Sequence, residues 1–300
     1  MIKILSVLLS VILMVPAPAG AAKAAPAGTE GVFVAGKFLS VAGAPDGSAY
    51  LLGADHRVVR VRPDGSQSVI ALPKIAEAKP GDRFCDLVTD GRTLAFCGFA
   101  FPVVFELNLK NPRQFTTFRP PDQEAASLHL LNISREADGW RLRDADGYVF
   151  RFRRDQPLQR LPRHAALEAG PQGATLLIPP PDPDKPRKRS GLVTKEDGSP
   201  FWAAPTPAAP RQVKSVEFLG YDADQRSVFS VITGSGELDT VFTLYAVRGG
   251  RIDASREIPG PAGLTMQRPC RLAPDGTILL VQAAGENGVL LQRVRLEGKK

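Results

Sequence analysis

The chain has 300 residues and a formal net charge of +7, from 38 basic and 31 acidic side chains. An excess of this size permits weak attraction to anionic surfaces but is too small to indicate a nucleic-acid-binding protein. Hydrophobic residues make up 43 % of the chain, enough for a sizeable core, and the 28 Gly and 27 Pro favour many short strands joined by turns.

The first segment, Met1–Ala22, has the pattern of a secretory signal peptide. Lys3 gives a positive start, Ile4–Val15 is an apolar run, and Ala19-Gly20-Ala21 fits cleavage between small residues. The run is too short to span a bilayer comfortably, and no later stretch is apolar enough to do so. We therefore expect an exported bacterial protein, periplasmic or secreted, with a flexible leader over residues 23–30.

The stretch Gly43–Pro73 reads as three short strands separated by Asp-Gly turns. Asp46-Gly47 and Asp64-Gly65 are turn signals, because Asp can bond its own backbone and Gly tolerates a positive φ. Between them, in Val58–Arg62, Val59 and Val61 alternate with Arg60 and Arg62, which is the period-two pattern of a strand with one buried face. No part of this stretch has helical spacing.

Weaker copies of this stretch recur along the chain. Cys85 and Cys270 even share the register C-x-L-x-x-D-G before their turns. The turn markers lie 34 to 52 residues apart, and they are Asp46, Asp90, Asp138, Gln172, Asp224 and Asp275. An all-strand repeat of this length is typical of the blades of a β-propeller. We therefore predict an all-β propeller, most simply of six blades with four antiparallel strands each, although five or seven blades also fit the spacing.

The two ends of the domain are predicted to meet. The chain ends only two strands after the last marker, so the final blade lacks an outer strand. The strand-like segment Gly31–Ser40 precedes the first marker and is available to supply it. Such a closure would hide two exposed sheet edges. Residues 31–300 would then form one domain, which we expect to be monomeric.

Three cysteines bear on the redox state. A three-residue loop at Asp90–Arg92 would place Cys85 opposite Cys97, close enough for a disulfide in an oxidising compartment. Cys270 is left over, and its simplest interpretation is a small buried hydrophobic residue.

The most biased loop is Pro179–Arg189, whose prolines exclude it from a central strand. Its basic residues are Lys185, Arg187, Lys188 and Arg189. They indicate either a contact for an anionic partner such as phospholipid, lipopolysaccharide or polyanionic glycan, or simply a solvated loop.

The sequence has no G-x-S-x-G, H-E-x-x-H or C-x-x-C motif, so no catalytic and no metal-ligating residue is assigned. In a propeller, the turns between second and third strands gather at one end of the axis, where binding sites are common. The residues these turns would bring to that rim are Asp55, His56, Asp144, Asp146, Glu237, Asp239 and Glu286. They could hold a hard divalent cation through oxygen ligands, or they are ordinary polar turns.

Two stretches resemble known propeller repeats. Ala44–Gly65 (APDGSAYLLGADHRVVRVRPDG) and Leu272–Val281 (LAPDGTILLV) are similar to blades of the NHL and SMP-30/gluconolactonase-like six-bladed propellers. In the lactonase branch, a Glu, an Asn and an Asp ligate a metal that polarises the lactone carbonyl. Glu30 is the candidate for that Glu, but no Asn or Asp lies in a matching motif, so these ligands are not carried over.

From these patterns we expect a binding or scaffold module in the bacterial envelope rather than an enzyme. Its partner would be a protein or an anionic envelope component. The alternative is a metal-dependent, lactonase-like hydrolase, which would use the rim carboxylates and a divalent cation.

Overall fold

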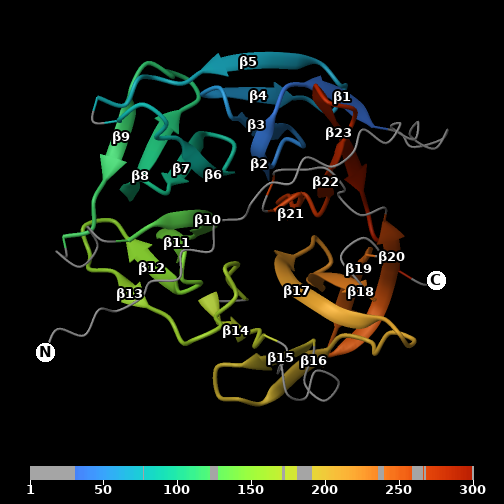
Figure 1. Ribbon diagram of the computed structural model, residues 1–300. Helices are drawn as coiled ribbons and strands as arrows, with labels where there is room; N and C mark the ends of the chain where they lie inside the picture. The colour runs from blue at the N-terminus through green and yellow to red at the C-terminus, as the bar shows by residue number, and fades with distance from the viewer. Residues whose placement is uncertain are drawn as a thin grey trace, which may run out of the picture.

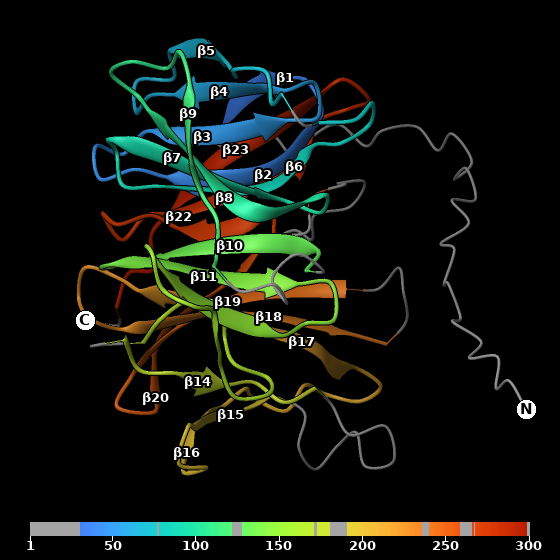
Figure 2. The same ribbon diagram turned by 90° about the vertical axis from the view of Figure 1, so that its left-hand side faces the viewer.

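A computed structural model describes residues 31–76, 78–121, 128–170, 173–180, 191–235, 240–258, 266 and 268–298. The predicted signal peptide and leader lie outside these residues. The described chain forms six antiparallel sheets arranged in a ring (Figure 1). In the side view, inner strands such as β2 (Phe38–Gly43) and β10 (Leu130–Glu136) run along the axis that Figure 1 looks down (Figure 2). The prediction of a six-bladed propeller is confirmed.

The blades follow the chain in order. Blade 1 comprises β2, β3 (Ala49–Gly53), β4 (Arg57–Val61) and β5 (Gln67–Ala71), and blade 2 comprises β6 (Phe84–Thr89), β7 (Thr93–Gly98), β8 (Phe101–Asn108) and β9 (Phe115–Phe118). Blade 3 comprises β10, β11 (Gly139–Asp144), β12 (Val149–Arg153) and β13 (Gln159–Arg160), and blade 4 comprises β14 (Leu176–Leu177), β15 (Leu192–Lys195) and β16 (Pro200–Ala203). Blade 5 comprises β17 (Gln212–Tyr221), β18 (Ser227–Gly234), β19 (Thr240–Arg248) and β20 (Arg251–Ile258), and blade 6 comprises β21 (Cys270–Leu272), β22 (Ile278–Ala283), β23 (Gly288–Val294) and β1 (Val32–Ala35).

Blade 4 has three named strands, and its innermost position is taken by a shorter segment. Ala165 forms an isolated antiparallel bridge with Leu177. The Ala166 amide donates to the Leu176 carbonyl at 2.7 Å, and the Ile178 amide donates to the His164 carbonyl at 2.8 Å. These bonds give blade 4 the same four-layer order as its neighbours.

The N-terminal strand closes the ring, as predicted. β1 pairs antiparallel with β23, with Val32 opposite Leu291 and Ala35 opposite Gly288. The segment predicted as one strand is in fact two, because the chain turns at Gly36, whose φ of 130° suits glycine. Its second half is β2, the inner strand of blade 1. One short stretch therefore contributes to the last blade and then to the first.

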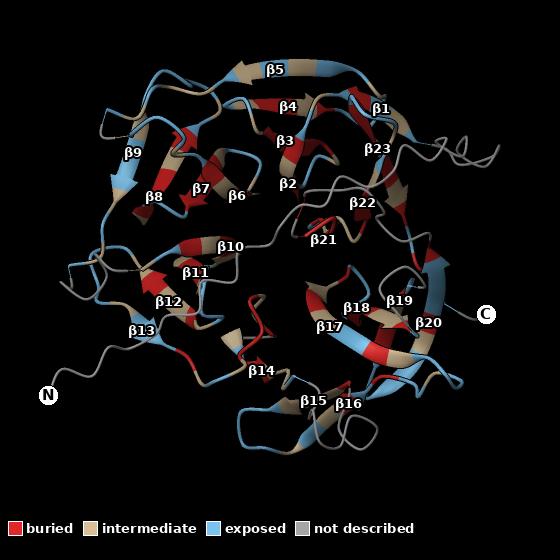
Figure 3. Ribbon diagram, viewed as in Figure 1, coloured by how far each residue is buried: buried red, intermediate tan, exposed pale blue. Residues whose placement is uncertain are grey.

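The core lies between neighbouring sheets (Figure 3). Between blades 6 and 1, for example, Leu279 and Leu291 pack with Val41 and Leu51. Between blades 4 and 5, Trp202 stacks on Phe229 with ring centroids 4.5 Å apart. No single sheet has both faces covered by its own residues, so burial of these layers requires the ring.

The described marker residues form the turns between first and second strands. Asp46 Oδ1 accepts the Ser48 amide at 2.9 Å, and Asp275 Oδ1 accepts the Thr277 amide at 3.0 Å. Gly47 follows with a φ of 75°. These aspartates are turn formers, because their carboxylates replace backbone partners that the tight turn leaves unpaired.

The predicted disulfide is wrong, because Cys85 and Cys97 are free thiols. The turn holds one more residue than predicted, so that Thr89 lies opposite Leu94 and Cys97 lies opposite Asp86. A register shift between Phe84 and Asp86 then leaves Cys85 unpaired. Cys270 is buried among apolar residues of blades 5 and 6, as the simplest interpretation predicted.

Candidate functional site

A register shift recurs near the start of four inner strands. It separates Phe38 from Ser40, Phe84 from Asp86, Leu130 from Asn132, and Val213 from Ser215. Each case has a buried apolar residue, one unpaired residue and then a polar residue. Bulges of this kind redirect side chains. Ser40, Asp86 and Asn132 are buried, although they are polar.

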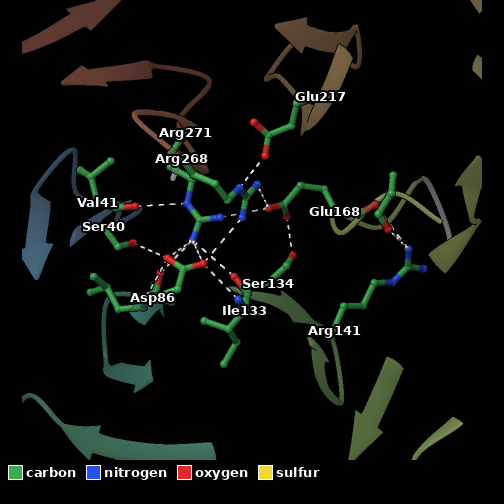
Figure 4. Close-up of polar contacts among 12 residues, drawn as sticks. Ser40, Val41, Asp86, Ile133, Ser134, Arg141, Glu168, Glu217, Arg268 and Arg271 are labelled. Atoms are coloured by element: carbon green, nitrogen blue, oxygen red, sulfur yellow. Dashed lines mark hydrogen bonds and ion pairs between the residues drawn. The ribbon is translucent and has the colours of Figure 1, made fainter. Parts of the chain in front are cut away.

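Arg271, on β21 of blade 6, extends into the centre of the ring (Figure 4). It is buried and bonds to groups from blades 1 to 4. Its Nε donates to the Val41 carbonyl at 3.1 Å, and its Nη2 donates to the Leu87 carbonyl at 2.8 Å and the Ile133 carbonyl at 3.3 Å. It also forms ion pairs with Asp86 at 3.2 Å and Glu168 at 3.5 Å. One side chain thus links five of the six blades.

Arg268 precedes β21 and completes the set. Its Nε lies 2.5 Å from Oε1 of Glu217 on β17, and its Nη2 lies 2.8 Å from Glu168 Oε1. These bonds add blade 5 and give blade 4 a second connection to blade 6. The Nη1 atom of Arg268 is buried without a hydrogen bond, and it lies 3.9 Å from Asp86 Oδ2. We call Asp86, Glu168, Glu217, Arg268 and Arg271 the axial network.

The electrostatics of the axial network depend on burial. Burial raises the pKa of Asp86 to about 6, although Arg268 and the hydroxyl of Ser40, which donates to Asp86, oppose the rise. Burial also disfavours the charged form of Arg268, but Glu217, Glu168 and Asp86 together raise its pKa above the ordinary value. Arg268 therefore stays charged, while Asp86 gains a proton in mildly acidic solution.

Another buried arginine, Arg141, holds the segment that carries Glu168. The Arg141 side chain is fully buried, and its Nε lies 2.5 Å from Glu136 Oε1. It donates to the Gly173 carbonyl at 2.9 Å and to the Glu168 carbonyl at 3.3 Å. Ser134 donates to the Glu168 carboxylate. These contacts position Glu168 between Arg268 and Arg271.

A cavity of about 460 Å³ adjoins the axial network between blades 3, 4 and 5. The exposed residues Gly147, Lys214 and Ser215 place its mouth at the end of the ring that carries the turns between second and third strands. Apolar residues of the wall include Leu167, Ile178, Val216 and Phe218, and polar ones include Asn132, Arg143, His164, Lys214, Glu217 and Arg268.

The charges in the cavity wall are unequal. Three cations, Arg143, Lys214 and Arg268, face one carboxylate, Glu217, which already binds Arg268. Burial and the nearby Arg268 lower the pKa of Arg143. Burial and Arg163 lower the pKa of His164, which favours its neutral form. The wall therefore has an excess of positive charge.

The described ones among the predicted rim residues lie in the expected turns, and their contacts do not converge on a common site. Asp55 pairs with Arg57 at 2.7 Å, and His56 lies edge-on to Phe84 at 5.6 Å. Asp144 is buried and accepts the Tyr148 amide at 2.8 Å, within its own turn.

The other predicted residues divide into exposed and undescribed ones. Asp146 and Glu286 are exposed, whereas Glu237, Asp239 and the basic residues Lys185, Arg187, Lys188 and Arg189 lie outside the described residues. Within the described part of the chain, no three His, Cys, Asp or Glu residues are grouped as a metal site requires. The described part also contains no helix with the length and apolar character needed to cross a membrane.

The axial network was missed from the sequence, although one signal for it was present. In the two copies of C-x-L-x-x-D-G, Asp86 and Arg271 occupy the first variable position, directly after the cysteine. Opposite charges at the same place in two copies of a ring repeat indicate residues that meet on the axis. The two residues are separated by 185 positions, so only a comparison of the repeats, and not the sequence around either residue, indicates their contact.

No protein-family model matches the chain, and no curated protein matches it. Solved structures are similar in fold. The WD40 β-propeller domain of Doa1 is 10 % identical, with 91 % of this chain and 96 % of that chain covered at a TM-score of 0.50. A streptogramin B lyase is 11 % identical, with 88 % and 97 % covered at 0.48. YCF48 bound to a D1 peptide is 11 % identical, with 89 % and 97 % covered at 0.44. At this identity the similarity to the Doa1 domain shows the propeller fold alone, and the resemblance to NHL and SMP-30-like repeats stays a prediction.

Proposed function

We propose that this protein is an exported, monomeric binding module of the bacterial envelope. Its recognition surface is the end of the ring at which the cavity opens, and its partner is an anionic envelope component. The observation that carries the proposal is the cavity wall, where Arg143, Lys214 and Arg268 outnumber the single carboxylate of Glu217. Export is inferred from the apolar run near the N-terminus.

The carboxylates near the axis favour binding over hydrolysis. The alternative, a metal-dependent hydrolase, would need carboxylates that are available to ligate a metal or to act as a base. Asp86, Glu168 and Glu217 each form an ion pair with an arginine instead. Their role in this arrangement is to hold Arg268 and Arg271 in place.

The basic loop belongs to the same proposal. Its sequence carries Lys185, Arg187, Lys188 and Arg189. The described residues that flank residues 181–190, Pro180 and Gly191, both line the cavity. Positive charge in the loop sequence and in the cavity wall would attract the same anionic partner.

Sedimentation with lipid vesicles tests the proposal. We expect the purified protein to sediment with phosphatidylglycerol vesicles and not with phosphatidylcholine vesicles. Binding should weaken as salt is raised, because salt screens exposed charges. Replacing the four basic loop residues by Gln should reduce binding. The control Arg295→Gln removes an exposed charge that lines a different pocket beside the Asp46 turn, and it should have little effect. Equal sedimentation with both lipids, or with neither, would contradict an anionic envelope partner.

A further inference from the structure

Arg143 is an arginine without a counterion. It lies on β11, with Asn132 opposite it on β10 and Val149 opposite it on β12. Among the residues that the structure describes, none hydrogen-bonds to its guanidinium or forms an ion pair with it, and the residue is partly buried. The guanidinium offers five N–H donors, which the described residues leave to solvent or to a ligand.

The positive charge of Arg268 near Arg143 also favours an anion at this place. Arg268 is close enough to lower the pKa of Arg143, so two like charges share one wall of the cavity. Glu217, Glu168 and Asp86 oppose this effect from a distance, but each is already bonded to Arg268 or Arg271. Arg268 also keeps one buried donor, Nη1, without a hydrogen bond. An anion beside Arg143 would supply acceptors for its guanidinium and would also be attracted by the positive charge of Arg268.

Part of the cavity wall is apolar. Leu167 and Ile178 from blade 4 and Val216 and Phe218 from blade 5 line the same cavity. Its volume of about 460 Å³ lies within the range of about 300–1,000 Å³ that is common for small-molecule sites. The cavity therefore offers a charged side and a hydrophobic side to one occupant.

We propose that this cavity binds a small amphiphilic anion. Its carboxylate or phosphate group contacts Arg143 and Arg268, and its apolar body packs against blades 4 and 5. This inference rests on the proposed function, because it places the anionic group of the partner in the cavity at the recognition surface. The group can belong to a free small molecule or to the end of an envelope lipid, and the two sources share the same contact chemistry.

Calorimetric titration with soluble anions tests the site. The probes are acetate, butyrate, hexanoate and butyl phosphate, added to the purified protein at constant ionic strength. Each added methylene should tighten binding by about fourfold, because it leaves water for the apolar wall. Arg143→Gln should weaken hexanoate binding by about tenfold or more, since it removes a charge-assisted hydrogen bond. Arg143→Lys should retain part of the affinity, because lysine keeps the charge without the bidentate fork.

Two further variants keep the test decisive. Arg295→Gln removes one positive charge from a different pocket and should leave the affinity unchanged. Ser215→Glu alters an exposed residue of the cavity, where folding is least at risk, and places a carboxylate that competes with the ligand. Because the new carboxylate would lie beside the cations of the cavity wall, Ser215→Glu should weaken hexanoate binding and raise the melting temperature.

The outcomes separate this inference from the proposed function. No binding by any probe, binding that ignores chain length, or undiminished binding by folded Arg143→Gln or Ser215→Glu would overturn the inference. Vesicle sedimentation that survives in Arg143→Gln would leave the envelope partner supported through the basic loop alone and would remove the cavity from it. Probe binding without vesicle sedimentation would support the cavity site and assign its ligand to free small molecules.

Discussion

Arg271 and Arg143 both take part in the charge distribution inside the ring, but Arg271 is buried and Arg143 is partly buried, and their contacts differ. Arg271 bonds to three backbone carbonyls and two carboxylates from other blades. Arg143 bonds to none of the residues that the structure describes and lines a cavity instead. The difference teaches that burial alone does not give an arginine's role. What separates the two roles is the number of acceptors around the guanidinium. An arginine whose donors are all bonded holds the fold together, whereas one with free donors is suited to a ligand.

The energetics of the two residues differ accordingly. A buried ion pair is weak evidence for stability, because desolvation offsets much of the attraction. It can still fix how elements meet, and Arg271 accepts only an arrangement in which Val41, Leu87 and Ile133 present their carbonyls together. Arg143 is partly buried, and none of the described residues accepts a hydrogen bond from its guanidinium. Three measurements can break or sharpen this contrast.

The largest effect is expected for Arg271→Met. The substitution keeps a similar volume but leaves Asp86 buried without its closest arginine. We expect a loss of about 3–5 kcal/mol in the free energy of unfolding, measured by urea denaturation. The double variant D86L/R271M removes both charges and should recover part of that loss. A loss below about 1 kcal/mol for the single variant would show that Arg271 does not hold the ring together.

A smaller effect on the free energy of unfolding is expected from the titration of Asp86. Its pKa is raised from 3.8 to about 6 in the folded protein, so the folded state binds the proton more tightly than the unfolded state. This group therefore favours folding at low pH, and its contribution of about 3 kcal/mol is lost as pH rises from about 4 to 6. Asp86→Asn should abolish that part of the slope in a plot of unfolding free energy against pH. Parallel curves for the two proteins would place the pKa of Asp86 near its ordinary value.

The smallest effect on stability is expected for Arg143→Gln. The variant removes a charge that has no described partner and that lies near Arg268. Its free energy of unfolding should match that of the parent protein within about 1 kcal/mol, or exceed it. A loss as large as that of Arg271→Met would show that Arg143 supports the fold, and the contrast between the two arginines would disappear.

The fold was largely predictable because its signals are local. The Asp-Gly turns at Asp46, Asp90 and Asp275 set the period, and strand alternation set the layers. Closure followed from a count of strands after Asp275, although the break at Gly36 did not. The disulfide prediction failed because one extra turn residue shifted Cys97 opposite Asp86. In such a sheet, a one-residue error changes every partner.

The candidate site was not predictable in the same way. The rim residues were selected from turns, where polar side chains mostly satisfy their own backbone, as Asp144 does with Tyr148. Asp86, Glu217 and Arg271 come from inner strands, where burial normally selects against charge. Only the ring brings Glu168, Glu217 and Arg268 together, and no local spacing records that geometry.

The pairing of β1 with β23 has a consequence for the order of assembly. During synthesis β1 leaves the ribosome long before its sheet partner β23, as Val32 opposite Leu291 shows. Until β23 is made, β1 stays unpaired, and such a free strand can recruit other chains. Protection of β1 from such encounters must last until β23 has been synthesised, and a chain that stopped before β23 would leave this strand exposed.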